Sequence, residues 1–288
     1  MQKITKDILK QIYTPRPLDS HKYDYGLLLV IGGGEFYTGS PALSAMAAFR
    51  SGVDMVQILA PKRAADIIAS FSPNLAAYPL KGDWLDQEDV PVLLSQTAAA
   101  RSVAGEKVAV VVGGGAGRSE QTQQALQVFL QETDSRIVVD ADAIHALAKN
   151  TFSIKDQPAI ITPNAHEFFI LCNRKVAGLS IEEKAKIVQE EAKKMNSVIL
   201  LKGPIDIISD GNQTVLDESG TPYMAVGGTG DTLAGICGAF LACGIDPFLA
   251  AQAASFINGK AGELASKKFG AGMTATDLIE EIPNVIKA

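Results

Sequence analysis

The sequence predicts an α/β fold in which a doubly wound, mostly parallel β-sheet lies between helices, in a single domain covering residues 1–288. Short apolar runs of strand length alternate with helical patterns along nearly the whole chain. The runs are continuously apolar rather than alternating, as expected for strands that are covered on both faces. Glycines and polar residues directly follow several runs, and ligands bind at the carboxyl ends of the strands in such sheets.

The strands are predicted from apolar runs that end in glycine or in Asp/Asn clusters. Each run has the length of a strand, and most are rich in β-branched side chains. The predicted strands cover residues 26–31, 55–60, 108–112, 136–139, 159–161 and 197–201.

The helices between the strands carry their own start signals. Ser40 is a suitable N-cap and is followed by proline, which predicts a helix over residues 41–51. Ser180 and Glu183 have the spacing of a capping box and begin an amphipathic helix that runs to about residue 195. Repeated alternation of this kind predicts a sheet covered by helices.

Charge and hydropathy exclude several classes of protein. The formal net charge of −6 argues against a nucleic-acid partner, because such proteins usually carry a basic stripe. It does not exclude a bound nucleotide, since local backbone N–H groups hold phosphate whatever the global charge. The N-terminus lacks a signal-peptide pattern, and the most apolar stretches are too short or too glycine-rich to span a bilayer. We therefore expect a cytoplasmic protein with no membrane partner.

The strongest candidate for chemistry is the glycine-rich turn at residues 226–233. Gly227, Gly228 and Gly230 let the backbone turn tightly and approach a ligand. A glycine turn that leads into a helix presents unpaired N–H groups and the positive end of the helix dipole, and both attract phosphate. The turn is neither a Walker A loop nor a dinucleotide fingerprint, and we predict that it handles nucleotide phosphate.

Asp231 lies at the start of the helix predicted over residues 232–241. An isolated Gly-Asp pair usually indicates a simple N-cap. Here the acid coincides with three glycines, a threonine hydroxyl and a helix of small residues. This combination favours a functional role for the carboxylate.

Two further glycine clusters follow predicted strands. Residues 32–42 contain four glycines together with Thr38 and Ser40 and open a helix, which favours a ligand loop. Residues 113–117 are equally consistent with a ligand loop and with a tight structural turn.

Polar residues also follow the later strands. Asn164 and Glu167 are candidates for a polar pocket, whereas His166 is interpreted as a surface or capping residue. Lys202 leaves a buried strand beside a glycine, where a lysine either extends to solvent or binds phosphate.

Asp140 and Asp142 follow the strand predicted at residues 136–139. They are candidate metal ligands, or one of them caps the next helix. No set of His, Cys and carboxylate residues has zinc-like spacing, and we assign no residue as a metal ligand. A Mg²⁺ ion held mainly by nucleotide phosphates and water fits better.

Taken in order, these motifs resemble those of the ADP/ATP-dependent NAD(P)H-hydrate dehydratases, a family of the ribokinase-like superfamily. The resemblance runs from about residue 26 to residue 283. It rests on the segments at residues 32–42, 50–56, 113–117, 139–142, 161–167, 201–203, 224–235 and 275–283.

The resemblance implies a role for individual residues. Asp231 would be catalytic. The residues implied to contact the substrate are Ala42, Gly115, Gly117, Asn164 and Asp231. The residues implied to line the nucleotide site are Lys202, Gly203, Pro204, Ile205, Asp206, Gly228, Thr229 and Gly230. The family usually has a histidine after Thr-Pro, and here that contact falls on Asn164 or on a shifted His166.

The resemblance also implies a reaction. The substrate would be the S-epimer of hydrated NADH or NADPH, dehydrated by phosphorylation of its C6 hydroxyl and loss of phosphate. The donor would be ADP, which gives AMP, or ATP, with Mg²⁺ as cofactor. The family further implies a functional pairing with a separate NAD(P)H-hydrate epimerase and a homo-oligomer, a homotetramer.

Two other functions remain open from the sequence. A small-molecule kinase of the same fold, such as a hydroxyethylthiazole or pyridoxal-type kinase, shares the Gly-Thr-Gly-Asp turn and differs in its substrate loops. A non-catalytic nucleotide sensor would use the same turn but gain nothing from a carboxylate beside a polyanion. Residues 32–42 and the segment ending at Glu167 favour the dehydratase, and Asp231 argues against the sensor.

Overall fold

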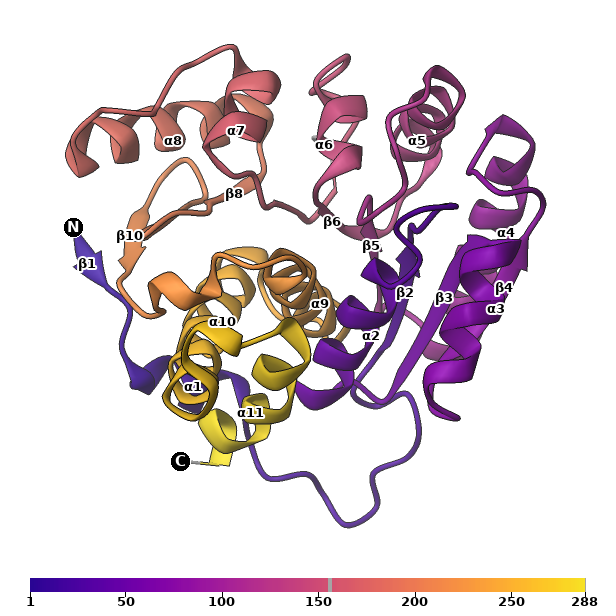
Figure 1. The fold of residues 1–288 in the computed structure, drawn as a ribbon, viewed down its shortest axis with the longest axis horizontal. Coiled ribbons are helices and arrows are strands. Elements are labelled where there is room, and N and C mark those ends of the chain that lie inside the picture. The colour runs from indigo at the N-terminus through magenta and orange to yellow at the C-terminus, as the bar shows by residue number, and fades with distance from the viewer. Residues whose placement is uncertain (155–156, 288) are drawn as a thin grey trace.

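A mixed ten-stranded sheet runs through the computed structural model, which describes residues 1–154 and 157–287, and helices cover both of its faces (Figure 1). The strand order is β1-β10-β9-β8-β7-β6-β5-β2-β3-β4. Of the paired strands, β9 is antiparallel to both of its neighbours and all other pairs are parallel. The predicted α/β class with a mostly parallel sheet is confirmed.

The strands are β1 (Gln2–Lys3), β2 (Leu27–Ile31), β3 (Met55–Pro61), β4 (Ala76–Leu80), β5 (Val108–Val112), β6 (Arg136–Val139), β7 (Ala159–Ile161), β8 (Val198–Leu201), β9 (Asp206–Ser209) and β10 (Thr214–Asp217). Every strand predicted from a continuous apolar run is present, within one residue of its predicted bounds. The sequence did not predict β1, β4, β9 and β10.

The α-helices are α1 (Leu9–Ile12), α2 (Ser40–Arg50), α3 (Lys62–Phe71), α4 (Val90–Ala104), α5 (Glu120–Glu132), α6 (Asp142–Leu147), α7 (Ala165–Cys172), α8 (Ile181–Met195), α9 (Thr229–Ala242), α10 (Pro247–Phe269) and α11 (Ala275–Lys287). Short 3₁₀ segments are η1 (Lys6–Ile8), η2 (Gln87–Asp89), η3 (Pro222–Met224) and η4 (Gly270–Gly272).

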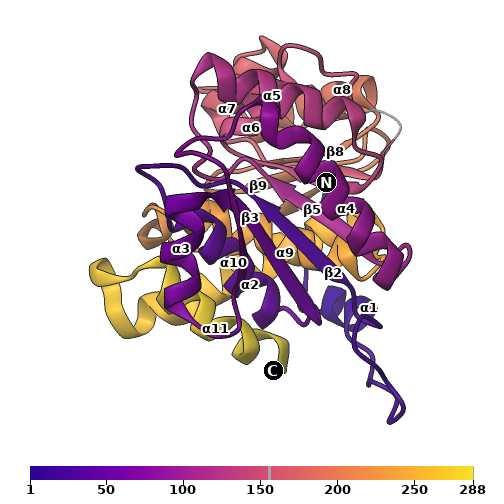
Figure 2. The same ribbon diagram turned by 90° about the vertical axis from the view of Figure 1, so that its right-hand side faces the viewer.

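The core consists of two layers, one on each face of the sheet. Alternate residues of each central strand point to opposite faces. In β2, Leu28 and Val30 belong to the core layer that includes residues of α2, α3, α9, α10 and α11, whereas Leu27, Leu29 and Ile31 belong to the layer that includes residues of α4 to α8. Figure 2 shows the two groups of helices on opposite sides of the strands. Within the described residues, no helix is both long and apolar enough to cross a membrane.

Glycines allow α9 to lie unusually close to its neighbours. A Cβ atom on Gly235 would lie 2.1 Å from the carbonyl oxygen of Ser44, and one on Gly238 would lie 2.4 Å from Val111 Cγ2. These positions exclude a side chain, so α9 packs directly on α2 and on the sheet. The close packing brings the first turn of α9 next to the first turn of α2.

The structure corrects two predicted helix starts. Helix α2 begins at Ser40 with Gly39 in the cap position, and the Ser40 hydroxyl donates to Asp231 instead of capping its own helix. Helix α9 begins at Thr229, three residues earlier than predicted, because the left-handed Gly228 (φ 97°) immediately precedes it. Asp231 therefore belongs to the first helical turn.

Candidate active site

The site forms where the winding of the sheet changes direction. From β2 the chain proceeds outward through β3 and β4, and then returns to place β5 on the other side of β2. The loops after β2 and β5 meet at this point, with the Gly33 N–H donating to the Gly114 carbonyl oxygen at 2.8 Å. Such a switch point is the usual ligand crevice of an open α/β sheet.

The first turn of α9 faces this crevice. A Cβ on Gly228 would lie 2.6 Å from Leu43 Cδ1 and 2.8 Å from Ala275 Cβ, so glycine is required both by its φ and by space. The Thr229 hydroxyl lies 2.9 Å from the Met224 carbonyl oxygen and holds the turn closed. The N–H groups of a first helical turn have no partner within the helix, so this end of α9 is suited to bind phosphate.

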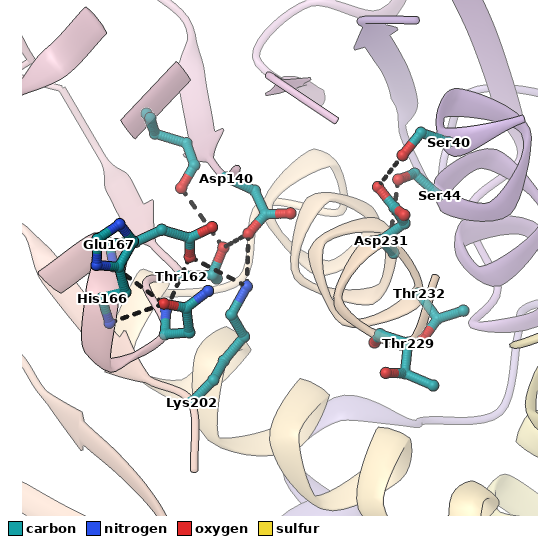
Figure 3. Close-up of polar contacts among 12 residues, drawn as sticks. Ser40, Ser44, Asp140, Thr162, His166, Glu167, Lys202, Thr229, Asp231 and Thr232 are labelled. Carbon is teal, nitrogen blue, oxygen red and sulfur yellow. Dashed lines mark hydrogen bonds and ion pairs between the residues drawn. The ribbon is translucent and has the colours of Figure 1, made fainter. Parts of the chain in front are cut away.

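Asp231 is held by residues of α2. Its Oδ1 accepts a 2.5 Å hydrogen bond from the Ser40 hydroxyl, and its carbonyl oxygen accepts one from the Ser44 hydroxyl at 2.9 Å (Figure 3). Burial raises the pKa of the Asp231 carboxyl to about 7, with a further increase from Asp140, while the Ser40 hydroxyl and Lys202 oppose it. Asp231 can therefore bind or release a proton near neutral pH.

A second polar cluster faces Asp231 across the crevice (Figure 3). Lys202 Nζ, after β8, donates to Asp140 Oδ1 at 2.9 Å and lies 3.8 Å from Glu167 Oε2. The Thr162 hydroxyl also donates to Asp140 Oδ1, at 2.7 Å. Burial lowers the pKa of the Lys202 ammonium, but Asp140 and Glu167 outweigh burial and the net change is upward. The crevice therefore contains a fixed cation between two carboxylates.

The segment after β7 forms a capping box. Asn164 Oδ1 accepts hydrogen bonds from the N–H groups of His166 and Glu167, both at 2.9 Å. Glu167 Oε2 accepts in turn from the Asn164 N–H at 2.8 Å. Asn164 and His166 are both exposed. The oxygen of Asn164 is thus committed to α7, which leaves its amide nitrogen for the predicted substrate contact.

Two cavities meet at the first turn of α9. The first, which we call the catalytic cavity after the predicted role of Asp231, has a volume of about 550 Å³ and is lined by three aspartates, Asp140, Asp142 and Asp231. The second, which we call the nucleotide cavity because most of the residues predicted for the nucleotide site line it, has a volume of about 530 Å³ and lies between β8, η3, α9 and α10. Lys202 and Gly230 line both cavities, and a Cβ on Gly230 would lie 3.4 Å from Lys202 Nζ. The two residues mark the junction between the cavities.

The predicted site residues distribute between these cavities with few exceptions. Those that line the catalytic cavity are Gly115, Lys202, Gly228, Gly230 and Asp231. Those that line the nucleotide cavity are Lys202, Gly203, Pro204, Asp206, Thr229 and Gly230. Gly117 lines a neighbouring cavity, and Asn164 lines none of the three. Ala42 is buried in α2, and Ile205 packs against the core.

The sequence prediction missed the contribution of α10. Asn258 accepts from the Thr232 hydroxyl at 2.7 Å and donates to the Thr229 carbonyl oxygen at 3.3 Å, which secures the first turn of α9. Ser255 and Asn258 also line the nucleotide cavity. Their spacing of three residues places both on one face of an otherwise alanine-rich helix, a signal that the sequence contained.

Asp206 is held in the nucleotide cavity by two hydrogen-bond partners. Its Oδ1 accepts from the Gly203 N–H at 2.9 Å, and its Oδ2 lies 2.8 Å from the Ser255 hydroxyl, which also lies 2.7 Å from Asp217 Oδ2. Burial raises the pKa of Asp206 to about 6, against the hydrogen bonds from Gly203 and Ser255. These bonds fix the loop at residues 203–206.

The described residues contain no group of three or more His, Cys, Asp or Glu side chains arranged to hold a metal ion. Of the predicted pair, Asp142 is engaged by the Gly117 N–H at 2.8 Å and by Arg118 Nε at 2.7 Å. Asp140 points into the crevice beside Lys202 (Figure 3). Carboxylate oxygens beside a phosphate-binding turn suit an ion that takes most of its ligands from phosphate and water.

Comparisons with known proteins agree with this geometry. The family model for NAD(P)H-hydrate dehydratase (Carb_kinase) matches residues 28–284. A bifunctional NAD(P)H-hydrate repair enzyme of Hyperthermus butylicus is 40% identical over 278 residues, which cover 94% of this chain and 50% of that protein. The chain thus spans about half the length of the bifunctional relatives that it matches.

Two other relatives match along their whole length. An ADP-dependent (S)-NAD(P)H-hydrate dehydratase of Cenarchaeum symbiosum is 37% identical over 289 residues, covering 99% of this chain and 96% of that protein. The crystal structure of an ADP/ATP-dependent NAD(P)H-hydrate dehydratase of Bacillus subtilis, co-crystallized with ATP and Mg²⁺, superposes with a TM-score of 0.84 at 28% identity. It covers 99% of this chain and 98% of that chain.

Proposed function

Because the chain belongs to the NAD(P)H-hydrate dehydratase family, we propose that it catalyses the nucleotide-dependent dehydration of the S-epimer of hydrated NADH or NADPH. One observation carries the proposal. The Asp231 carboxylate lies in a catalytic cavity that meets the nucleotide cavity at Lys202 and Gly230. A substrate hydroxyl beside Asp231 therefore lies near the terminal phosphate of a nucleotide in the adjoining cavity.

The reaction proceeds by activation of a poor leaving group. The C6 hydroxyl oxygen of the hydrated ring attacks the terminal phosphorus of ADP or ATP, and the bond from that phosphorus to the nucleotide's bridging oxygen breaks. The ring nitrogen lone pair then expels inorganic phosphate from C6, and loss of the C5 proton restores the double bond. The products are NAD(P)H, phosphate and AMP, or ADP when ATP is the donor.

Asp231 serves as the general base of the first step. Its pKa of about 7 lets the ionised carboxylate accept the C6 hydroxyl proton as the phosphorus–oxygen bond forms. The Ser40 hydroxyl stabilises the ionised form and fixes the orientation of Oδ1. A positioned general base of this kind contributes roughly 10²–10⁴-fold to the rate.

The remaining groups of the junction stabilise negative charge. The backbone N–H groups at Gly228 to Gly230 and the Lys202 ammonium face the position of the transferred phosphoryl group. When bound, Mg²⁺ neutralises charge on the nucleotide phosphates. Asp140, whose side chain lines the catalytic cavity, would contribute a carboxylate oxygen to the ion, with most ligands from phosphate and water.

The test is recovery of the reduced nicotinamide absorbance from hydrated NADH and hydrated NADPH, with ADP or ATP in parallel reactions. We expect recovery with at least one donor, together with release of one phosphate per NAD(P)H formed. A phosphorylated product that accumulates without recovery of the absorbance indicates a kinase and contradicts the proposal. Nucleotide binding without phosphate release on either substrate indicates a sensor.

A further inference from the structure

A third cavity adjoins the catalytic cavity. This distal cavity, of about 790 Å³, shares Phe36, Tyr37, Gly115, Arg118 and Asp142 with the catalytic cavity, and none of its lining residues belongs to the nucleotide cavity. The catalytic cavity therefore lies between the other two. A substrate whose reacting ring sits at Asp231 can extend away from the nucleotide into the distal cavity.

Three large aromatic side chains line the distal cavity and remain exposed. The exposed fractions are 79% for Phe36, 65% for Tyr37 and 41% for Trp84. The rings of Phe36 and Tyr37 meet edge to face with centroids 4.9 Å apart. Exposed aromatic faces gathered in one cavity suit a planar base, since every base presents a face on which an aromatic ring can stack.

Trp84 is built into the loops that form the catalytic cavity. A Cβ on Gly34 or on Gly117 would lie 2.9 Å from Trp84 Cζ3. The two glycines follow β2 and β5, so the indole lies directly against both loops of the switch point. The Gly117 N–H is in turn held by Asp142 at 2.8 Å. The indole is therefore positioned by the two loops that meet beside the catalytic cavity.

Arg118 stands at the boundary between the two cavities. Its Nε donates to Asp142 Oδ1 at 2.7 Å, and its side chain is 57% exposed. A guanidinium carries five N–H donors in a fixed fork, of which this bond uses one. Arginine in this arrangement is suited to bind phosphate oxygens.

We propose that the distal cavity binds the AMP half of the dinucleotide substrate, with the adenine stacked on Trp84 and the linking diphosphate at Arg118. The inference rests on the proposed function, because it assigns the part of the substrate that does not react. The order of groups in the molecule matches the order of features in the protein. The hydrated ring is at Asp231, the diphosphate is at the boundary, and the second base is among the aromatic rings.

A truncated substrate tests the inference. Hydrated reduced nicotinamide mononucleotide has the reacting ring but lacks the AMP half. The Trp84→Ala variant is expected to raise the KM for hydrated NADH by about 5- to 150-fold, the range for loss of one base–aromatic stack, and to leave the KM for the truncated substrate unchanged. Trp84→Phe is expected to retain most of the preference for the dinucleotide. Phe71→Ala, which removes another exposed aromatic ring outside these cavities, provides the matched control.

Two results overturn the inference. If Trp84→Ala raises the KM equally for both substrates, the indole only supports the loops. If it changes the KM for neither, the indole has no role in binding. Binding gives a second readout that needs no turnover. Trp84 is the only tryptophan of the chain, so its fluorescence reports on the distal cavity alone. Hydrated NADPH added without ADP or ATP is expected to quench the Trp84 fluorescence, after correction for absorbance. The truncated substrate is expected to leave this fluorescence unchanged.

The two proposals fail differently. If the wild-type protein dehydrates neither hydrated NADH nor hydrated NADPH, the proposed function is wrong. Quenching of Trp84 by the dinucleotide but not by the mononucleotide still supports the distal site in that case. Equal quenching by both compounds, or by neither, contradicts it.

Discussion

The Ser40 hydroxyl donates a 2.5 Å hydrogen bond to Asp231 Oδ1 across 191 residues of sequence. The bond joins the first turn of α2 to the first turn of α9. It also fixes the direction of the carboxylate at the place where the loops after β2 and β5 meet. A Cβ on Gly114 would lie 2.6 Å from the same oxygen, so the Asp231 side chain occupies space that glycine leaves open. The proposed general base is thus set by three segments that lie far apart in the chain.

Replacement of the general base is expected to abolish most turnover. The Asp231→Asn variant keeps the size of the side chain but accepts no proton, so kcat is expected to fall roughly 10²–10⁴-fold. Steady-state assays with hydrated NADH measure the loss, and calorimetric titration with ADP checks that nucleotide binding persists. Wild-type turnover in this variant contradicts the assignment of Asp231.

The same variant is expected to change how stability depends on pH. The folded-state pKa of Asp231 is raised to about 7, so protonation favours the folded protein. This contribution is fully present below the unfolded pKa of about 4 and is lost as pH rises toward 7. The difference in Tm between Asp231→Asn and wild type should therefore shift in favour of the variant between pH 4 and pH 8. A difference in Tm between the variant and wild type that is the same at pH 4 and pH 8 contradicts the raised pKa.

The acidic limb of the pH–rate profile is expected to report Asp231. Because the carboxylate must be ionised to act as a base, kcat/KM should fall as the pH decreases through about 7. The Ser40 hydroxyl favours the ionised form, and the Ser40→Ala variant should shift this limb to higher pH. If the acidic limb stays at the same pH in Ser40→Ala, it arises from the nucleotide phosphates and not from Asp231.

Removal of the cation at the junction is expected to affect both folding and nucleotide binding. Lys202→Met leaves Asp140 buried without its ion pair, and loss of one partner of a buried pair costs about 3–5 kcal/mol of the free energy of unfolding. Urea unfolding measures this change. The double variant Lys202→Met, Asp140→Asn should recover much of the stability but not the affinity for ADP. Recovery of both contradicts a role for Lys202 in binding phosphate.

Two adjacent glycines give a matched pair for testing the phosphate turn. Gly228 has φ 97°, and a Cβ there would meet Leu43 and Ala275 below 3.0 Å, whereas a Cβ on Gly227 has no described atom within 4 Å. Gly228→Ala is expected to lower the free energy of unfolding by about 1–3 kcal/mol and to weaken ADP binding. Gly227→Ala should be nearly neutral for stability. Equal effects at both positions contradict the strained turn.

The central sheet was predictable because its signal is local. The strands from β2 to β8 that lie inside the sheet are predominantly apolar, with Gln57 in β3 and Arg136 in β6 as exceptions, and the residues that follow them include the glycine turns and Lys202. The strands that the sequence did not predict carry weaker signals. Most of β4 is accessible to solvent and it contains Pro79, both residues of β1 are exposed, and β9 begins at Asp206, which was assigned to the nucleotide loop. Short, partly exposed strands lack the apolar run on which prediction depends.

The sequence by itself determined the α/β class, the glycine-rich turn before α9 and the presence of an acid at the start of α9, since each depends on residues close together in the chain. Only the tertiary structure decided which polar side chains pair with one another. Ser40 caps no helix and binds Asp231, and Lys202 pairs with Asp140 across 62 residues of sequence. The physical reason is that a buried polar group takes whichever partner the packing of the elements supplies, and local spacing does not record that packing.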